Sequence, residues 1–201
     1  AADASPAVRE RVAPDAQGAW HERLQAPNGE PLPEEAALAL HVAACRETFE
    51  ESGVLLARDR SGAACGGERT ARLQELREAV AADASTFVSL LEREDLYLDL
   101  APLVYWSHWI TPSLEPKRYD TRFFAIALPA DQSASADRCE LTDHAWIRRR
   151  SGNGATHVRR GGGASPDRRE DRPAAVAAPC TLRRVVPDGA AARTARHPPD
   201  P

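Results

Sequence analysis

Three acidic side chains gather in one stretch of the sequence, at Glu47, Glu50 and Glu51, directly after Arg46. Residues three and four positions apart share a face of a helix, so this spacing would bring all three carboxylates together. Clustered carboxylate oxygens are the ligands that Mg²⁺ and Mn²⁺ prefer, with substrate phosphates filling the remaining positions. Arg46 can pair with Glu50 one turn later, or with a neighbouring carboxylate. The pattern predicts a divalent-metal site, and the plainer alternative is a solvated acidic face on an ordinary helix.

A helix over residues 34–52 is the element that must hold these carboxylates. The segment contains neither Gly nor Pro and is rich in Ala, Leu and Glu, which favour helix. Pro33 suits the start of a helix, and Gly53 suits the left-handed residue that ends one. His41, on the inner side, is expected to be structural. A short buried strand is expected immediately afterwards, over residues 54–57.

The pattern of apolar residues predicts further helices and strands before residue 148. The expected helices cover residues 68–81 and a shorter stretch that begins at Ser85, as a cap, and ends near residue 94. The expected strands cover residues 103–110, 121–129 and 139–147. The strand over 121–129 is apolar enough to lie centrally in a sheet. Residues 1–33 contain five prolines and are expected to form a polar loop.

Charge is unevenly distributed along the chain, although the net value is only −4. Residues 1–147 carry 14 basic and 25 acidic residues, a net of −11, whereas residues 148–201 carry 12 basic and 5 acidic residues, a net of +7. An acidic body suits a cation-binding enzyme better than a nucleic-acid binder. The arginine-rich segment also lacks the interleaved aromatic residues that bind bases. The expected partner is therefore a small molecule and not nucleic acid.

The sequence shows no feature of a membrane or secreted protein. It has no run of about 18 apolar residues, and its N-terminal segment lacks the basic and apolar regions of a signal peptide. The four cysteines are scattered, without zinc or disulfide spacing. We therefore expect a cytoplasmic protein with reduced thiols and no membrane partner.

The residues from Arg46 to Val54, R-E-T-F-E-E-S-G-V, resemble the core of the Nudix box, R-E-U-x-E-E-x-G-U, in which U is a bulky aliphatic residue. Thr48 departs mildly at the first U. The full box has a Glu eight residues before the Arg and a Gly six before that Glu, where this chain has Leu38 and Leu32. The branch with the peroxisomal acyl-coenzyme A diphosphatases and their bacterial relatives carries an insertion here, which displaces the glycine-rich turn far upstream.

Two later segments also resemble that branch. WSHWITP at 106–112 and KRYDTRFFAIALP at 117–129 are similar to its tryptophan-rich W-x-x-W-x-T-P and R-x-D-T-x-F-F segments. The resemblance covers roughly residues 1–147. It implies the α/β class, with a Nudix-type α/β/α sandwich around a mixed sheet.

The resemblance further implies a metal-dependent hydrolase that cleaves a diphosphate linkage in a nucleoside diphosphate-linked substrate. Glu47, Glu50 and Glu51 would hold Mg²⁺ or Mn²⁺ and, with Arg46, form the catalytic set. Coenzyme A or an acyl-coenzyme A is the favoured substrate, and NADH and nucleotide sugars remain open. The alternative is a non-catalytic truncated remnant, or a binding module, that keeps the acidic helix but does not turn over.

Aromatic and basic residues in the two later segments are further candidates for the site. Trp106 and His108 are expected on one face of a strand, with Trp109 on the other. These three residues form core and cross-strand packing, or they form a platform for the adenine or the pantetheine arm of a substrate. Arg118 and Arg122 form turn and edge salt bridges, or they grip substrate phosphates.

The chain is expected to consist of a partial hydrolase domain with a helical insertion, residues 1–147, and a tail, residues 148–201. A Nudix sheet normally begins with strands before its glycine-rich turn. Residues 1–33 offer no strand-like apolar run, so the domain is expected to be incomplete at its N-terminus and unstable or inactive. The tail is rich in Arg, Pro, Ala and Gly without an apolar period, which predicts disorder. Its abrupt start favours a frameshifted translation over a genuine tail.

Overall fold

The computed structural model describes residues 2–14, 24–26, 29–112, 114–115, 119–129, 131–135, 145–147, 158–160 and 184–185. Helices and strands occur together along these residues, which confirms the predicted α/β class. In chain order the elements are η1 Ala2–Ala4, α1 Pro6–Glu10, α2 Glu34–Ser52, β1 Ala57–Arg58, α3 Gly67–Leu73, η4 Gln74–Leu76, α4 Arg77–Ala82, α5 Ser85–Arg93, β2 Tyr97–Leu98, β3 Val104–Ile110, β4 Tyr119–Ala125, β5 Ala145–Ile147, β6 Val158–Arg160 and β7 Arg184–Val185.

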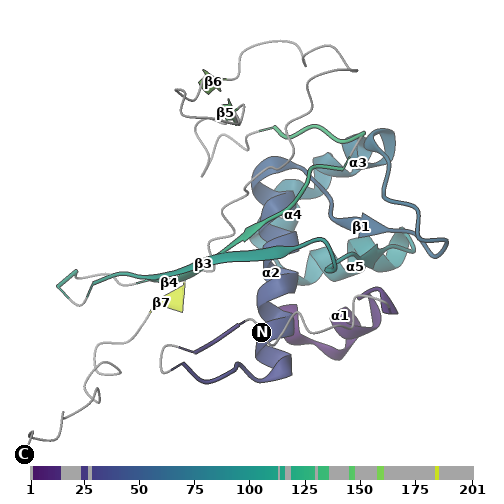
Figure 1. The fold of residues 1–201 in the computed structure, drawn as a ribbon. Helices are drawn as coiled ribbons and strands as arrows, with labels where there is room; N and C mark the ends of the chain where they lie inside the picture. The colour runs from purple at the N-terminus through teal and green to yellow at the C-terminus, as the bar shows by residue number, and fades with distance from the viewer. Residues whose placement is uncertain are drawn as a thin grey trace, which may run out of the picture.

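Helix α2 is the central element of the structure, and α1, α3, α4 and α5 lie to one side of it (Figure 1). Its bounds confirm the helix predicted over residues 34–52. Gly53 ends it with φ 71° and donates its N–H to the Phe49 carbonyl at 2.9 Å. The sequence therefore fixes both the length of this helix and the point at which the chain leaves it.

His41 lies on the buried side of α2 and packs against the larger sheet. Its Nδ1 is 2.8 Å from the Ala37 carbonyl oxygen, and its ring centroid is 4.9 Å from that of Phe124 on β4. Burial lowers the pKa of His41, and the hydrogen bond to Ala37 opposes this only in part. The expectation that His41 is structural is confirmed.

Strand β2 joins three distant parts of the chain in a small mixed sheet. It pairs antiparallel with β1, where Ala57 lies opposite Leu98. The Leu98 N–H donates to the Arg11 carbonyl at 2.7 Å, and the Ala13 N–H donates to the Leu98 carbonyl at 3.0 Å, so that Val12 forms a parallel bridge with Leu98. Parallel and antiparallel neighbours thus lie on either side of one strand.

The short strand predicted over residues 54–57 is present only at its last residue. Val54, Leu55 and Leu56 are buried as expected, but β1 begins at Ala57. The backbone of Leu55 is instead paired with a side chain: Gln132 Oε1 accepts from its N–H at 2.8 Å, and Gln132 Nε2 donates to its carbonyl at 2.8 Å. The side-chain amide of Gln132 therefore pairs with this backbone in place of a neighbouring strand.

The helical segment between β1 and β2 is more broken than its periodicity suggests. The single helix predicted over residues 68–81 is two helices, α3 and α4, joined by the 3₁₀ turn η4. The turn begins at Gln74, whose side chain donates to the Gly53 carbonyl at 3.2 Å. Helix α5 confirms the next prediction, except that Ser85 is its first residue and not its cap; the Ser85 N–H donates to Asp83 Oδ1 at 2.9 Å.

Strands β3 and β4 form an antiparallel hairpin that crosses α2, and its far end extends away from the helical body (Figure 1). The register shifts between Tyr105 and Ser107, which marks a bulge at Trp106. Strand β7 pairs with the other edge of β4. This arrangement confirms the predicted strand over 103–110 and the central position of β4, but β4 begins at Tyr119 and ends at Ala125, short of the predicted end at residue 129.

The N-terminal segment corrects the expectation of a polar loop over residues 1–33. Residues Pro6–Glu10 form helix α1, with Pro6 in its first turn and Ser5 Oγ accepting from the Val8 N–H at 3.3 Å. Val8 and Leu24 lie in the main core with essentially no exposed surface. Pro6 starts a helix instead of breaking one. The N-terminal segment also packs against α2 through η1.

The segment beyond residue 147 contributes two described strands. β6 pairs with β5, within the edge strand predicted to end at residue 147, and β7 pairs with β4. The rest of the tail lies outside the described residues, so its order and its origin stay predictions. No helix among the residues that the structure describes is both long and apolar enough to cross a membrane.

Candidate metal-binding face of helix α2

Arg46 is the centre of an ionic cluster on helix α2. Its Nη1 donates to Glu50 Oε1 at 2.6 Å, and its Nη2 lies 3.6 Å from Glu47 Oε1. Its Nε and Nη2 donate to the two carboxylate oxygens of Asp3, at 3.0 and 3.3 Å. Burial alone would lower the pKa of Arg46, but the hydrogen bonds and charges of Asp3 and Glu50 outweigh it and raise that pKa. The guanidinium is therefore a permanent cation.

Two of the three predicted carboxylates, Glu47 and Glu50, lie together beside Arg46. Glu47 and Glu50 both meet Arg46, and about 15% of each side chain is exposed (14% and 15%). Glu51, in the same turn, is partly buried. Hard oxygen donors on a partly open helix face suit Mg²⁺ or Mn²⁺ in chemical type. In the described part of the chain, however, no three His, Cys, Asp or Glu side chains are grouped so that they could hold an ion.

The C-terminal turn of α2 is held by groups from two other segments. Arg77 Nε, at the start of α4, donates to the Glu50 carbonyl at 2.9 Å, and its other nitrogens donate to Ser135. The Ser135 N–H in turn donates to the Ser52 carbonyl at 2.8 Å. Together with Gln74 on Gly53, these bonds satisfy carbonyls that a helix end leaves unpaired. The cation of Arg77 also suits the negative end of the helix dipole.

The opposite side of the acidic turn is anchored in the core. Phe49 has no exposed surface, and its ring centroid is 6.1 Å from that of Phe87 on α5. Thr48 is buried, and its hydroxyl donates to the Ala44 carbonyl at 2.7 Å. The departure of Thr48 from a bulky aliphatic residue is thus accommodated by a hydrogen bond back to the helix. These anchors hold α2 in one orientation about its axis, so the carboxylates stay on the side of the helix away from the core.

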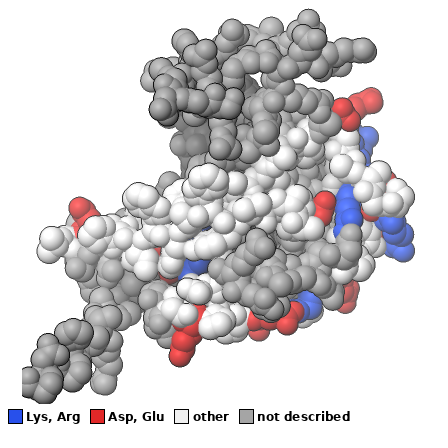
Figure 2. Space-filling model, in the orientation of Figure 1, with Lys and Arg blue, Asp and Glu red and all other residues white. Residues whose placement is uncertain are grey.

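The tryptophans of β3 are exposed. Trp106 is 74% and Trp109 is 69% accessible, so neither belongs to the core. The surface over the β3–β4 hairpin is mostly uncharged, with acidic and basic residues toward its margins (Figure 2). Packing of these two residues in the core is therefore ruled out, whereas cross-strand packing and a role as a platform both stay predictions.

His108 lies on the inner face of the hairpin, opposite Arg122 on β4. His108 Nε2 is 2.5 Å from Asp120 Oδ1, and Arg122 Nη1 donates to the same oxygen at 2.9 Å. Arg122 Nη2 donates to the Gln25 carbonyl at 3.1 Å, and the side chain is almost fully buried. The expectation of a salt bridge at Arg122 is confirmed, whereas Arg118 lies outside the described residues.

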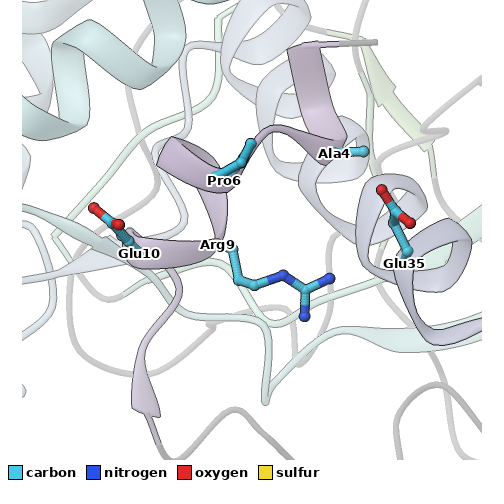
Figure 3. Close-up of a pocket in the computed structure, with 5 residues that line it drawn as sticks. All are labelled: Ala4, Pro6, Arg9, Glu10 and Glu35. Atoms are coloured by element: carbon cyan, nitrogen blue, oxygen red, sulfur yellow. The ribbon is translucent and has the colours of Figure 1, made fainter.

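A shallow hollow of about 490 Å³ lies between α1 and the start of α2. Ala4, Pro6, Arg9, Glu10 and Glu35 line it, and Arg9 extends across it toward α2 (Figure 3). Glu35 is eleven residues before the cluster at Arg46, roughly 16 Å along the helix axis. The hollow lies toward the N-terminal end of α2, and we assign it no part in the site.

Two residues of the site were not predicted from the sequence. Asp3 reaches Arg46 from 43 residues away, and Arg77 reaches the Glu50 carbonyl from 27 residues away. Neither position belongs to a motif, so no local signal identifies it. The burial of Cys45 raises the pKa of its thiol, which supports the expectation that it is a packing residue and not a nucleophile.

Comparison with known proteins places these observations in a family. A family model described as the NUDT19 Nudix domain matches residues 5–154 of the chain. The matched segment ends at residue 154, beyond the domain boundary predicted at residue 147, and that boundary stays a prediction.

Curated relatives are similar over slightly more than half of this chain. Acyl-coenzyme A diphosphatase NUDT19 of Homo sapiens is 34% identical over 124 residues, which are 57% of this chain and 32% of that protein. The protein of the same name in Gallus gallus is 35% identical over 60% of this chain and 35% of its own length. Putative nudix hydrolase 7 of Caenorhabditis elegans is 30% identical over 53% of this chain and 34% of its own length. The chain thus spans about a third of the length of these relatives.

A solved structure is also similar. The crystal structure of a NUDIX hydrolase from Alicyclobacillus acidocaldarius matches with a TM-score of 0.43 and 28% sequence identity, covering 53% of this chain and 48% of that one.

Proposed function

Because the chain belongs to the NUDT19 Nudix domain family, whose model matches residues 5–154, we propose that it takes part in the metal-assisted hydrolysis of a diphosphate linkage. By lineage it is a Nudix-type diphosphatase. The observation that carries the proposal is the face of α2 on which Glu47 and Glu50 converge on Arg46. The activity of the whole protein is part of the proposal, since the chain spans only about a third of its relatives.

Glu47, Glu50 and Glu51 are the residues that would hold Mg²⁺ or Mn²⁺. When bound, a divalent cation offsets the negative charge that develops on the diphosphate oxygens. One of the three carboxylates orients a water and accepts its proton as the oxygen attacks one phosphorus, and the other phosphate leaves. Arg46 fixes the direction of Glu50 and balances part of the charge of the cluster.

Coenzyme A or an acyl-coenzyme A is the substrate that we favour. Relatives from human and chicken are named acyl-coenzyme A diphosphatases. The exposed rings of Trp106 and Trp109 could stack on an adenine or lie along a pantetheine arm. Arg118 and Arg122 stay candidates for phosphate binding, although Arg122 already forms an ion pair with Asp120. NADH and nucleotide sugars are the competing substrates.

A non-catalytic binding module is the second candidate function. Two observations favour it: Glu50 is hydrogen-bonded to Arg46, and the described residues include no group of three His, Cys, Asp or Glu that could hold a metal ion. In that case Arg46 would replace a metal as the permanent counter-ion of the acidic face. The two candidate functions differ in whether Glu47 and Glu50 can leave Arg46 and bind a cation.

The cellular compartment that we propose is the cytoplasm. Cys45 and Cys65 are both buried free thiols, which fits a reducing environment. No membrane or nucleic-acid partner is part of the proposal.

Metal titration tests the proposed function. Mn²⁺ binding to the wild-type chain is measured by calorimetry beside the Glu50→Gln, Glu51→Gln double variant. The charge-matched control is the Glu75→Gln, Glu78→Gln double variant, which removes two exposed acids of η4 and α4. We expect the control to bind like the wild type and the Glu50→Gln, Glu51→Gln variant to lose at least about tenfold in affinity. Equal affinity in wild type and the Glu50→Gln, Glu51→Gln variant would refute the site.

Product analysis tests the reaction. Coenzyme A and Mn²⁺ are incubated with a full-length relative that contains this segment, and we expect 3′,5′-ADP and phosphopantetheine by chromatography. Metal binding without these products would favour the binding module, and products that form equally well with a chelator present would contradict metal assistance.

A further inference from the structure

Asp3 binds the Nε and Nη2 side of Arg46, whereas Glu50 binds Nη1; Nη2 also lies 3.6 Å from Glu47 Oε1. Its two carboxylate oxygens accept from Arg46 Nε and Nη2 at 3.0 and 3.3 Å, a two-pronged contact that fixes the plane of the guanidinium. Glu50 accepts from the remaining nitrogen, Nη1, at 2.6 Å. Residue 3 also lies before the segment that the family model matches, which begins at residue 5.

The position of Asp3 is fixed by the segment that carries it. The turn η1 lies against α2 (Figure 1). Ser5 caps α1 immediately afterwards, and Val8, one turn later, is buried in the core. Only 17% of the Asp3 side chain is exposed. Asp3 therefore has a fixed position in the cluster and is not a mobile surface charge.

The contact with Asp3 determines what happens to Arg46 when Glu50 moves. Only 13% of the Arg46 side chain is exposed, so its charge is costly to leave without a partner. If Glu50 turns toward a cation, Arg46 keeps two hydrogen bonds to Asp3. Without the Asp3 carboxylate, Arg46 would instead compete with the cation for Glu50 and Glu47.

We propose that Asp3 is a positioning residue of the metal site, which holds Arg46 and neutralises it so that Glu50 is released to a divalent cation. The proposal rests on the proposed function, because it assigns to Asp3 a role in metal binding at Glu47, Glu50 and Glu51. Asp3 itself touches neither the cation nor the substrate. It acts through Arg46, and that coupling is what the experiment must measure.

A double-mutant cycle on the full chain tests the coupling. Mn²⁺ affinity is measured by calorimetry for wild type, Asp3→Asn, Arg46→Gln and the double variant. Glu34→Gln is the matched control, because it also removes one acid from an arginine pair, the exposed contact of Arg9 and Glu34 at 3.5 Å. Asp3→Asn is expected to weaken Mn²⁺ binding roughly tenfold, as loss of an outer partner does in metal sites, and Glu34→Gln to leave it unchanged.

In the Arg46→Gln background, the same change at residue 3 is expected to alter affinity by less than about twofold, because its target is gone. Melting temperatures without metal are recorded for every variant, and Asp3→Ser replaces Asp3→Asn if the latter does not fold. Wild-type affinity in Asp3→Asn, or an equal loss in both backgrounds, overturns the proposal for Asp3 alone. If the wild type binds no Mn²⁺, the proposed function and the role of Asp3 fall together.

Discussion

The side-chain amide of Gln132 pairs with the backbone of Leu55 in both directions, as a neighbouring strand would. The oxygen accepts from the Leu55 N–H and the nitrogen donates to the Leu55 carbonyl, each at 2.8 Å, and the nitrogen also donates to the Cys65 carbonyl at 2.9 Å. All three bonds are buried. Gln132 thus completes the backbone pairing of the segment that leaves the acidic helix.

Replacement of Gln132 by Ala should therefore destabilise the fold. It leaves one N–H and two carbonyls buried without these partners, and we expect a loss of about 2 to 4 kcal/mol in the free energy of unfolding. Urea denaturation measures it. Ser133→Ala, at the exposed neighbouring position, is the control and should change the value by less than about 0.5 kcal/mol. Equal stability of the two variants would contradict the role of Gln132.

Gly53 should tolerate substitution less well than Gly62. Both have positive φ, 71° and 87°, so a change to Ala costs about 1 kcal/mol at either position. A Cβ at Gly53 would lie 2.6 Å from Gln74 Nε2, whereas one at Gly62 would meet nothing within 4 Å. Gln74 would have to give up its bond to the Gly53 carbonyl, which adds about 1 kcal/mol. Chemical denaturation of the two Ala variants compares them, and equal losses would show that Gln74 adapts freely.

Trp106→Ala and Trp109→Ala should affect ligand binding without affecting stability. Both rings are exposed, so their removal should change the melting temperature little. If the rings hold an adenine or a pantetheine arm, each change should weaken coenzyme A binding by about tenfold. Leu114→Ala, at a fully exposed position beyond β3, is the control. Unchanged affinity in both tryptophan variants would remove these residues from the proposed site.

Acidification below the ordinary pKa of His41 should destabilise the protein. Burial lowers the pKa of this side chain from 6.5, so the folded state binds its proton less readily than the unfolded state. The contribution of His41 is therefore complete above pH 6.5 and declines as the pH falls below it. Urea denaturation between about pH 7.5 and pH 5.5 measures the decline. His41→Leu should show a shallower decline, and an unchanged slope would assign the effect to other groups.

Local patterns in the sequence predicted the elements that local interactions determine. Helix α2 was predictable because its propensities, its first-turn acids and the stop at Gly53 all agree. The α2 face was predictable because the spacing of Glu47, Glu50 and Glu51 fixes it whatever the tertiary structure. Both features depend only on residues within a few positions of one another.

The missed features depend on contacts between residues far apart in sequence. Gln132 replaces a strand from 77 residues away, so the expectation of a full strand after Gly53 could not have been corrected locally. Trp106 and Trp109 match a buried strand in composition, but composition does not say which face of a sheet is covered. The prolines of the first 33 residues predict a loop, and only the packing of Val8 into the core shows that Pro6 begins a helix.

The parallel bridge between Val12 and Leu98 bears on the order in which the chain can fold. Just beside it, Arg11 and Asp95 form an ion pair across 84 residues, so this contact closes a very long loop. Long loops are slow to close, whereas α2 and the helices that follow it can assemble through short-range contacts. We therefore expect the N-terminal segment to dock last. Asp3 then meets Arg46 only in the final step, so the acidic face would mature together with the native state and not before it.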